Sequence, residues 1–245
     1  MIVLFAPSES KQEGGNLSPL EKESLFFADL YPYRLEAIEK YEHFILNAAE
    51  PELSKLFGIK EQKEYAKYLR SFREAKTMKA IERYNGVAYE YLEYSTLNQQ
   101  EQKYIDDNVI IFSNLFGPLR ASDQIPDYKV KQGEEIDGFN LEKHYRKYFT
   151  DAIGNCIGND EVLDLRAGFY EKFYVHSTPV TTMKFLRDGK VVSHWAKAYR
   201  GLVLRTAAKG KVQSIDELLA MEISGLKLEE IHELKKKKEI IYTIL

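Results

Sequence analysis

The sequence predicts an α/β fold of the mixed α+β kind, with one central mixed sheet and helices around it. Three short apolar segments, each followed by a polar or glycine-containing loop, are typical of buried strands. Amphipathic segments of helical period lie between them, and an Asp-Gly pair between two alternating runs indicates a β-hairpin. No repeat, low-complexity segment or linker interrupts the 245 residues. We therefore predict a single domain over residues 1–245.

The spacing of apolar residues predicts the first elements. Residues 1–5, "MIVLF", are apolar and rich in branched side chains, which predicts a buried strand that enters the polar loop 6–19. Residues 34–49 and 61–78 place apolar side chains at helical intervals and predict two amphipathic helices. The pair Asn85-Gly86 indicates a turn.

A second strand and helix follow in the middle of the chain. Residues 98–108 predict a short polar helix, which leads directly into a second buried strand at 109–112. Residues 140–153 have a helical pattern. The segment 161–174, "EVLDLRAGFYEKFY", then repeats the order of strand, loop and aromatic helix.

The last third of the chain contains the clearest turn signal. Asp188-Gly189 lies between two alternating runs and favours a type I′ hairpin turn. Residues 197–210 predict a helix, and Ser214 with Glu217 has the capping-box pattern of another. Residues 235–245 predict a final strand.

The composition limits the possible functions. With 44% hydrophobic residues, 30% charged residues and a net charge of -3, the chain is not a wholly basic nucleic-acid coat, so any anion-binding surface must be local. One cysteine, Cys156, excludes an intramolecular disulfide and is typical of a reducing compartment. The apolar run at the start is too short for a signal peptide or a membrane span. We expect a cytoplasmic protein with no membrane partner.

The sequence contains no motif typical of a metal site or of a catalytic serine. The five histidines are scattered, with no pair three or four residues apart and no paired cysteines, and no G-x-S-x-G motif occurs. We predict no metal site and no cofactor.

The segment "SNLFGPLR" is the first candidate anion site. Proline is favoured at the first position of a helix, and the free amides there bind anions, so Gly117-Pro118 predicts a phosphate-binding helix start. Arg120 would lie one turn further and could bind a phosphate with two hydrogen bonds. The alternative is that Gly117 only supplies a tight turn and Arg120 pairs with Asp123 or Asp127.

The loop "PSESK" is the second candidate. Ser8, Ser10 and Lys11 follow a buried strand, and ligands of α/β proteins gather at the carboxyl ends of strands. The loop lacks the glycines of a Walker motif, so it does not specify a nucleotide. A solvated loop with helix-capping serines is the alternative.

The segment 186–211 has the strongest excess of basic over acidic residues in the chain. It contains seven basic residues and one acid, Asp188. A helix that starts near Lys197 would bring Lys197 and Arg200 together beside Trp195, which suits a phosphate backbone or an unpaired base. A solvated charged face is the alternative.

A further polar cluster follows the predicted third strand. Asp164, Arg166 and Glu171 surround Gly168, where an acid or base could act. An internal ion pair between Asp164 and Arg166 is the alternative.

Taken together, the motifs resemble the YaaA family of bacterial peroxide-stress proteins. They are "FAPSESK", "AIERYNGVAYEYLEY", "FSNLFGPLRASDQIPDYKVKQG", "VLDLRAGFYEKFY" and "AKAYRGLVLRTAA", and their order and spacing match nearly the whole chain. The resemblance implies a YaaA-type fold: a single α/β domain with a basic cleft and a helix-hairpin-helix-like element at Asn114–Gly117. It also implies binding to duplex and distorted DNA and a role in iron homeostasis that limits damage from hydrogen peroxide.

The same resemblance assigns DNA-contacting residues by motif. It carries this role to Ser8, Lys11, Asn114, Gly117, Arg120, Tyr128, Lys129, Lys197, Arg200 and Arg205. The chain departs from the family in having Asn114 where many relatives have glycine, Ala121 where proline is common and Lys129 where arginine is usual. Because asparagine tolerates the left-handed conformation, we expect the turn to form. Lys129 can hold a phosphate only as a point charge.

Two hypotheses from different classes follow. The first is a DNA-binding protein of the oxidative stress response, with sequence-independent backbone contacts. The second is an enzyme that acts on a nucleotide or nucleobase in a pocket at the strand ends, formed by Ser8, Ser10, Lys11, Asp164, Arg166 and Glu171. No recognisable catalytic motif supports turnover. If Arg120 and Arg200 line one concave face, the first hypothesis gains a defined site.

Overall fold

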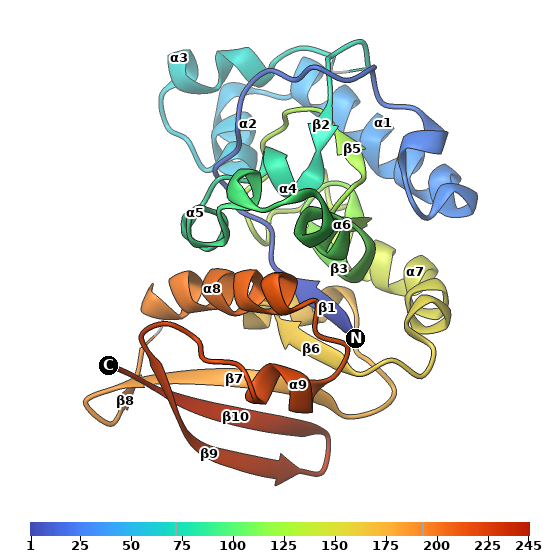
Figure 1. Cartoon of the computed structure of the whole chain (residues 1–245). Coiled ribbons are helices and arrows are strands. Elements are labelled where there is room, and N and C mark those ends of the chain that lie inside the picture. Colours follow the sequence, from blue (N-terminus) through green and yellow to red (C-terminus); the bar gives the residue numbers. More distant parts are fainter. Residues whose placement is uncertain (72, 193) are drawn as a thin grey trace.

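A mixed sheet forms the centre of the computed structural model, which describes residues 1–71, 73–192 and 194–245. Within these residues the sheet has eight strands in the order β4-β3-β1-β6-β7-β10-β9, with β8 paired to β7. Helices surround it (Figure 1). The predicted mixed α/β architecture with a central sheet is confirmed.

Three predicted strands lie side by side at the middle of the sheet. β1 (Ile2–Phe5) lies between β3 (Val109–Ser113) and β6 (Val162–Leu165), parallel to both. All residues of these strands are buried, which explains why the strands are mostly apolar rather than alternating, with Ser113 and Asp164 as the polar exceptions. Since the three strands are parallel, the loops that follow them leave from the same edge of the sheet.

The remaining strands complete the two sides. β4 (Gly117–Arg120) pairs antiparallel with β3, and β7 (Val180–Arg187) pairs parallel with both β6 and β10 (Lys237–Ile244). β9 (Leu226–Leu234) lies antiparallel to β10, and β8 (Lys190–Val191) closes a hairpin with β7. A separate two-stranded sheet joins β2 (Met78–Lys79) to β5 (Gln124–Ile125).

The helices pack on this framework. They are α1 (Tyr31–Asn47), α2 (Glu50–Phe57), α3 (Gln62–Tyr65), α4 (Ala80–Arg83), α5 (Val87–Leu92), α6 (Gln99–Asn108), α7 (Leu141–Ile157), α8 (His194–Gly210) and α9 (Ile215–Leu219). Short 3-10 helices cover Lys22–Ser24, Ala28–Leu30, Ala66–Tyr68, Tyr94–Thr96 and Gly168–Phe173.

Two long helices position the site. α8 packs against α5, α6 and β7, and α7 packs against β4, α1 and the 3-10 helix Gly168–Phe173 (Figure 1). Phe185 of β7 stacks on Tyr199 of α8 with 5.5 Å between the ring centres. Alternate residues of β7, from Thr181 to Phe185, are buried. This face of the strand anchors α8 above the carboxyl ends of β1 and β6.

Several local predictions are confirmed. Asp188 and Gly189 have φ values of 52° and 73°, as a type I′ turn requires. The Oγ of Ser214 accepts the backbone N–H of Glu217 at 3.2 Å and caps α9. None of the described helices has the length and apolar character that crossing a membrane requires.

The predicted helix start at Gly117-Pro118 is wrong. Gly117 pairs with Ser113, and Pro118 with Phe112, so the segment is an edge strand that follows a tight turn. Proline is compatible with an edge strand because it has no N–H to donate. Strands therefore flank Asn114–Gly117 on both sides, and the helix-hairpin-helix-like element expected there is a β-hairpin.

Two further predictions need correction. The helix expected over residues 61–78 is α3, which ends at Tyr65; a 3-10 helix follows to Tyr68, and Met78 already belongs to β2. Phe72, which belonged to that pattern, lies outside the described residues. The sequence pattern also gave no sign of β9, whose residues are almost all exposed.

Candidate functional site

A cavity of about 350 Å³ lies at the carboxyl ends of β1 and β6. The chain leaves β1 toward β3 on one side and returns later to β6 on the other, so the two loops diverge and leave a crevice between them. The residues that line it are Phe5, Ala6, Pro7, Ser8, Glu9, Gly86, Ala88, Tyr89, Gln132, Leu165, Ala167, Tyr170, Lys197 and Arg200. Crevices at this position in parallel sheets are where ligands of α/β proteins bind.

Two cations form one wall of this cavity. Lys197 and Arg200 lie three residues apart on α8 and therefore share a face of the helix. Among the residues that the structure describes, neither has a hydrogen-bond or ion-pair partner. Burial lowers the pKa of Arg200, and Asp164 and Glu171 oppose that shift. Since guanidinium stays protonated in proteins, Arg200 keeps its positive charge at the cavity, beside the exposed ammonium group of Lys197.

Aromatic rings form another part of the lining, which we call the aromatic wall: Phe5, Tyr89 and Tyr170. The hydroxyl of Tyr89 donates to the carbonyl of Ala6 at 2.8 Å, and its ring meets Phe5 edge to face at 5.4 Å between centres. Tyr170 lies in the loop after β6 and is also nearly buried. These contacts hold the rings in place.

Ser8 approaches the start of α5 very closely. A Cβ at Gly86 would lie 2.2 Å from Ser8 Oγ, so only glycine allows this contact without displacement of Ser8. Ser8 Oγ accepts the backbone N–H of Ser10 at 3.2 Å, which leaves the hydroxyl proton free to donate.

Lys11 lies in a neighbouring open hollow of about 450 Å³ together with Glu9, Ser10 and Lys129. Its ammonium donates to the carbonyls of Ser8 at 3.3 Å and Glu9 at 3.5 Å, and lies 4.1 Å from the ring centre of Tyr128. Burial and the nearby charge of Lys129 lower the pKa of Lys11 to about 7, against the opposing influence of Asp127 and Glu9. Lys11 therefore changes charge near neutral pH.

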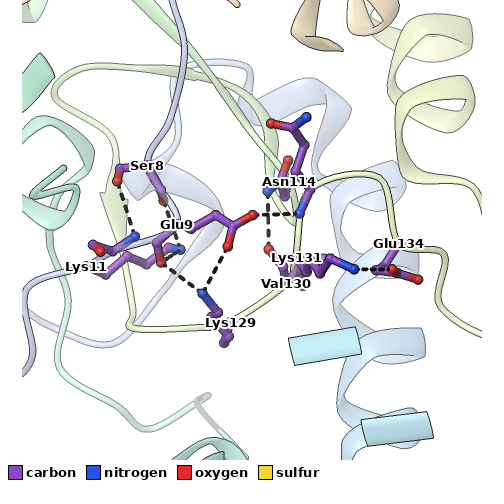
Figure 2. Close-up of polar contacts among 10 residues, drawn as sticks. Ser8, Glu9, Lys11, Asn114, Lys129, Val130, Lys131 and Glu134 are labelled. Carbon is purple, nitrogen blue, oxygen red and sulfur yellow. Dashed lines mark hydrogen bonds and ion pairs between the residues drawn. The ribbon is translucent and has the colours of Figure 1, made fainter. Parts of the chain in front are cut away.

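The loop after β1 is tied down by Glu9. Its carboxylate pairs with Lys129 Nζ at 3.4 Å and accepts the backbone N–H of Gln132 at 3.2 Å. Figure 2 shows Glu9 beside Lys129 and the segment that includes Val130 and Lys131. Lys129 thus has an ion-pair partner, while Lys197 and Arg200 have none among the described residues.

The titration of Lys11 gives a stability prediction. Its folded pKa of about 7 lies below the ordinary lysine pKa of 10.5, so between these values the unfolded chain binds more protons than the folded one. The free energy of unfolding contributed by Lys11 is therefore lowest below pH 7 and rises as pH increases through this interval. Urea denaturation of wild type and Lys11→Met from pH 6 to pH 9 should show a rise that the variant lacks. Parallel pH profiles would contradict the assignment.

Arg205 has a structural role. It donates to the carbonyls of Leu92 at 2.8 Å and Glu93 at 3.1 Å and pairs with the Glu93 carboxylate at 3.4 Å. These bonds close the carboxyl end of α5, where Glu93 has a φ of 47°. Arg205 does not line the cavity.

Arg120 lies at the opposite edge of the sheet. Because β4 runs antiparallel to β3, Arg120 pairs with Ile110 near the start of β3, far from the ends of β1 and β6. Its guanidinium lies 4.0 Å from the ring centre of Phe26, and Nη2 lies 3.1 Å from Cys156 Sγ. Arg120 and Arg200 therefore do not line one concave face.

Three other motif residues are buried. Asn114 Nδ2 donates to the carbonyl of Val130 at 3.2 Å, and the hydroxyl of Tyr128 lies 2.9 Å from that of Tyr84 and 2.7 Å from Ser113 Oγ. Gly117, rather than Asn114, has the left-handed backbone of the turn, with a φ of 67°. These three residues shape the hairpin and its surroundings and do not line the cavity.

Asp164 and Arg166 form an internal ion pair, as the alternative interpretation of this segment predicts. Nε and Nη2 of Arg166 contact the two carboxylate oxygens at 2.9 Å and 2.6 Å. Nη1 donates to the carbonyls of Tyr170 and Tyr174, and the guanidinium lies 4.6 Å from the ring centre of Phe112. The pair is buried and fully hydrogen-bonded, which suits a role in holding the loop after β6.

The six residues of the predicted enzymatic pocket do not converge. Ser8 lines the cavity, Ser10 and Lys11 line the neighbouring hollow, and Asp164, Arg166 and Glu171 line a third hollow of about 370 Å³. Sequence reasoning missed the aromatic wall because Tyr89 and Tyr170 follow patterns typical of core helices. The Asn85-Gly86 turn was the available signal for that region.

Comparison with known proteins identifies the family of this chain. The family described as peroxide stress protein YaaA matches residues 1–232. A protein of Campylobacter jejuni is 48% identical over 245 residues, which cover 100% of both chains. A UPF0246 protein of Corynebacterium efficiens is 34% identical over 85% of each chain, and one of Streptomyces coelicolor is 29% identical over 89% of each. The chain belongs to the YaaA family of peroxide stress proteins.

Proposed function

We propose that this peroxide stress protein binds DNA and contacts phosphates through Lys197 and Arg200 at the carboxyl-end cavity. The observation that carries the proposal is the pair of cations on one face of α8 with no partner among the described residues. Charges left without partners at a crevice need a counter-ion, and a phosphate diester supplies one. Contacts of this kind are independent of sequence and sensitive to salt.

Two other cations of the basic segment 186–211 have partners within the protein, which supports an electropositive surface local to Lys197 and Arg200. Arg205 is bound by Glu93, and Lys211 donates to Gln100 Oε1 at 2.9 Å, so these cations are used within the fold. The net charge of -3 is unfavourable for DNA elsewhere on the surface. DNA binding should therefore depend on few residues.

Membership in a peroxide stress family suggests the cellular role of the proposed DNA binding. In the proposal, DNA binding is the step through which the protein limits damage by peroxide and iron. Survival of cells under peroxide should accordingly fall when Lys197 and Arg200 are both replaced, at equal protein abundance. Undiminished survival would separate DNA binding from the stress role.

Fluorescence anisotropy with a labelled duplex and a labelled bubble DNA at low salt tests DNA binding. Lys197→Gln with Arg200→Gln should weaken affinity for both DNAs by about tenfold or more, because each phosphate contact adds a charge-assisted hydrogen bond. Lys209→Gln, on the same helix but outside the cavity, and Arg120→Gln, at the opposite edge of the sheet, should change affinity less than threefold. No binding by wild type, or equal effects of all variants, would overturn the proposal.

A further inference from the structure

The cavity combines two walls that a backbone-binding groove does not need together. Lys197 and Arg200 contribute charge to the lining, and the nearly buried rings of Phe5, Tyr89 and Tyr170 contribute aromatic carbon. A groove that only follows phosphates requires the first wall alone. Proteins that bind unpaired strands combine cations with aromatic rings on which bases stack.

We propose that this cavity receives a single unpaired nucleotide of the bound DNA, with its base against the aromatic wall and its phosphate on Lys197 and Arg200. The inference rests on the proposed DNA binding and adds the part of the DNA that the protein recognises. It assigns a ligand to residues that the family's known motifs leave without one, including Tyr89, Ala167 and Tyr170.

The size of the cavity fits one nucleotide and excludes a duplex. Its volume of about 350 Å³ lies at the lower end of the range of about 300–1,000 Å³ that is typical of small-molecule sites. The walls come from the loops after two adjacent parallel strands and from α5 and α8, so the space is bounded by rigid elements. A base can enter it only after leaving its stack.

The aromatic wall is held in place before any ligand arrives. Tyr89 is fixed by its hydrogen bond to Ala6 and by contacts with two rings, Phe5 edge to face at 5.4 Å and Tyr84 tilted at 5.5 Å between centres. Tyr170 packs against Phe173 with 6.1 Å between ring centres. Rings that need no rearrangement lower the entropic cost of binding a base.

Polar groups at the same cavity can contact the edge of a base. The hydroxyl of Ser8 retains its proton for donation, and Gln132 brings an amide to the lining from the segment that Glu9 holds. Amide and hydroxyl groups can pair with any base, so we expect recognition of an unpaired base with little sequence preference.

Three DNAs that differ only at one position test this inference by anisotropy. They are a perfect duplex, the same duplex with one bulged nucleotide, and the same bulge without its base. Wild type should bind the bulged nucleotide about tenfold more tightly than the duplex, within the range of base stacking on aromatic side chains. Loss of the base should remove this preference.

Substitutions that fill the cavity test the same inference from the protein side. Ala167→Leu adds apolar volume to the partly exposed lining and should remove the preference for the bulged nucleotide over the duplex. Ala88→Leu fills the cavity from α5 and should act in the same way, which guards against a folding defect in one variant. Lys209→Leu is the control outside the cavity.

The outcomes separate this inference from the proposed function. No binding to any of the three DNAs overturns both. Intact binding to the duplex without preference for the bulge, or a preference that the baseless bulge or Ala167→Leu retains, overturns the inference alone. Thermal stabilisation by free deoxynucleoside monophosphates without a bulge preference would assign the cavity to free nucleotides and also overturn it.

Discussion

Replacement of Arg34 by methionine should lower the free energy of unfolding by about 4 kcal/mol, because it leaves buried carbonyls without donors. Arg34 is fully buried on α1. Its guanidinium donates to the carbonyls of Phe116 at 3.1 Å, Phe27 at 3.2 Å and Pro118. It lies 4.8 Å from the ring centre of Phe149. One side chain thus joins α1 to the hairpin of β3 and β4.

The charge of Arg34 also supports a buried carboxylate. Burial raises the pKa of Asp123 to about 6, and Arg34 is the largest opposing influence. Loss of the guanidinium would raise this pKa further and add to the destabilisation near neutral pH. Urea denaturation monitored by circular dichroism measures the change, with Arg146→Met, an exposed replacement on α7, as the matched control. A loss below about 1 kcal/mol for Arg34→Met would show that the three carbonyls find other donors.

Replacement of Gly117 by alanine should cost about 3 kcal/mol, since backbone strain and a steric clash add together. Gly117 has a φ of 67°, and an added Cβ would lie 2.3 Å from Cδ1 of the Tyr145 ring. Tyr145 cannot move away easily because it is fully buried and its hydroxyl donates to the carbonyl of Leu115 at 2.6 Å.

Gly138 provides the control for this prediction. It has a φ of 73°, but an added Cβ would have nothing within 4 Å. Gly138→Ala therefore has the backbone strain without the clash and should cost about 1 kcal/mol. Equal losses for the two variants in urea denaturation would show that Tyr145 accommodates the methyl group.

The sequence predicted the elements whose signals are local. The three central strands are mostly apolar and fully buried, and Asp188-Gly189 specifies its hairpin turn by backbone preference alone. Gly117-Pro118 was ambiguous because the φ of proline fits both a helix start and an edge strand. Pairing with β3, a tertiary interaction, decides between them.

The candidate site was predictable only in part for the same reason. The spacing of Lys197 and Arg200 places them on one helix face, which sequence alone reveals. Because β4 runs antiparallel to β3, Arg120 lies at the other edge of the sheet, and Arg205 forms an ion pair with Glu93. Local sequence reveals neither the strand direction nor the ion pair. A motif resemblance groups residues by family and does not say which edge of the sheet they occupy.

The dependence of DNA affinity on salt is the most informative single measurement. Each phosphate contact on duplex DNA contributes about -0.9 to the slope of log affinity against log salt concentration. The slope measured for wild type should therefore exceed that of Lys197→Gln with Arg200→Gln by about 2 in magnitude. Equal slopes and affinities for the two proteins would contradict the placement of DNA phosphates at this cavity.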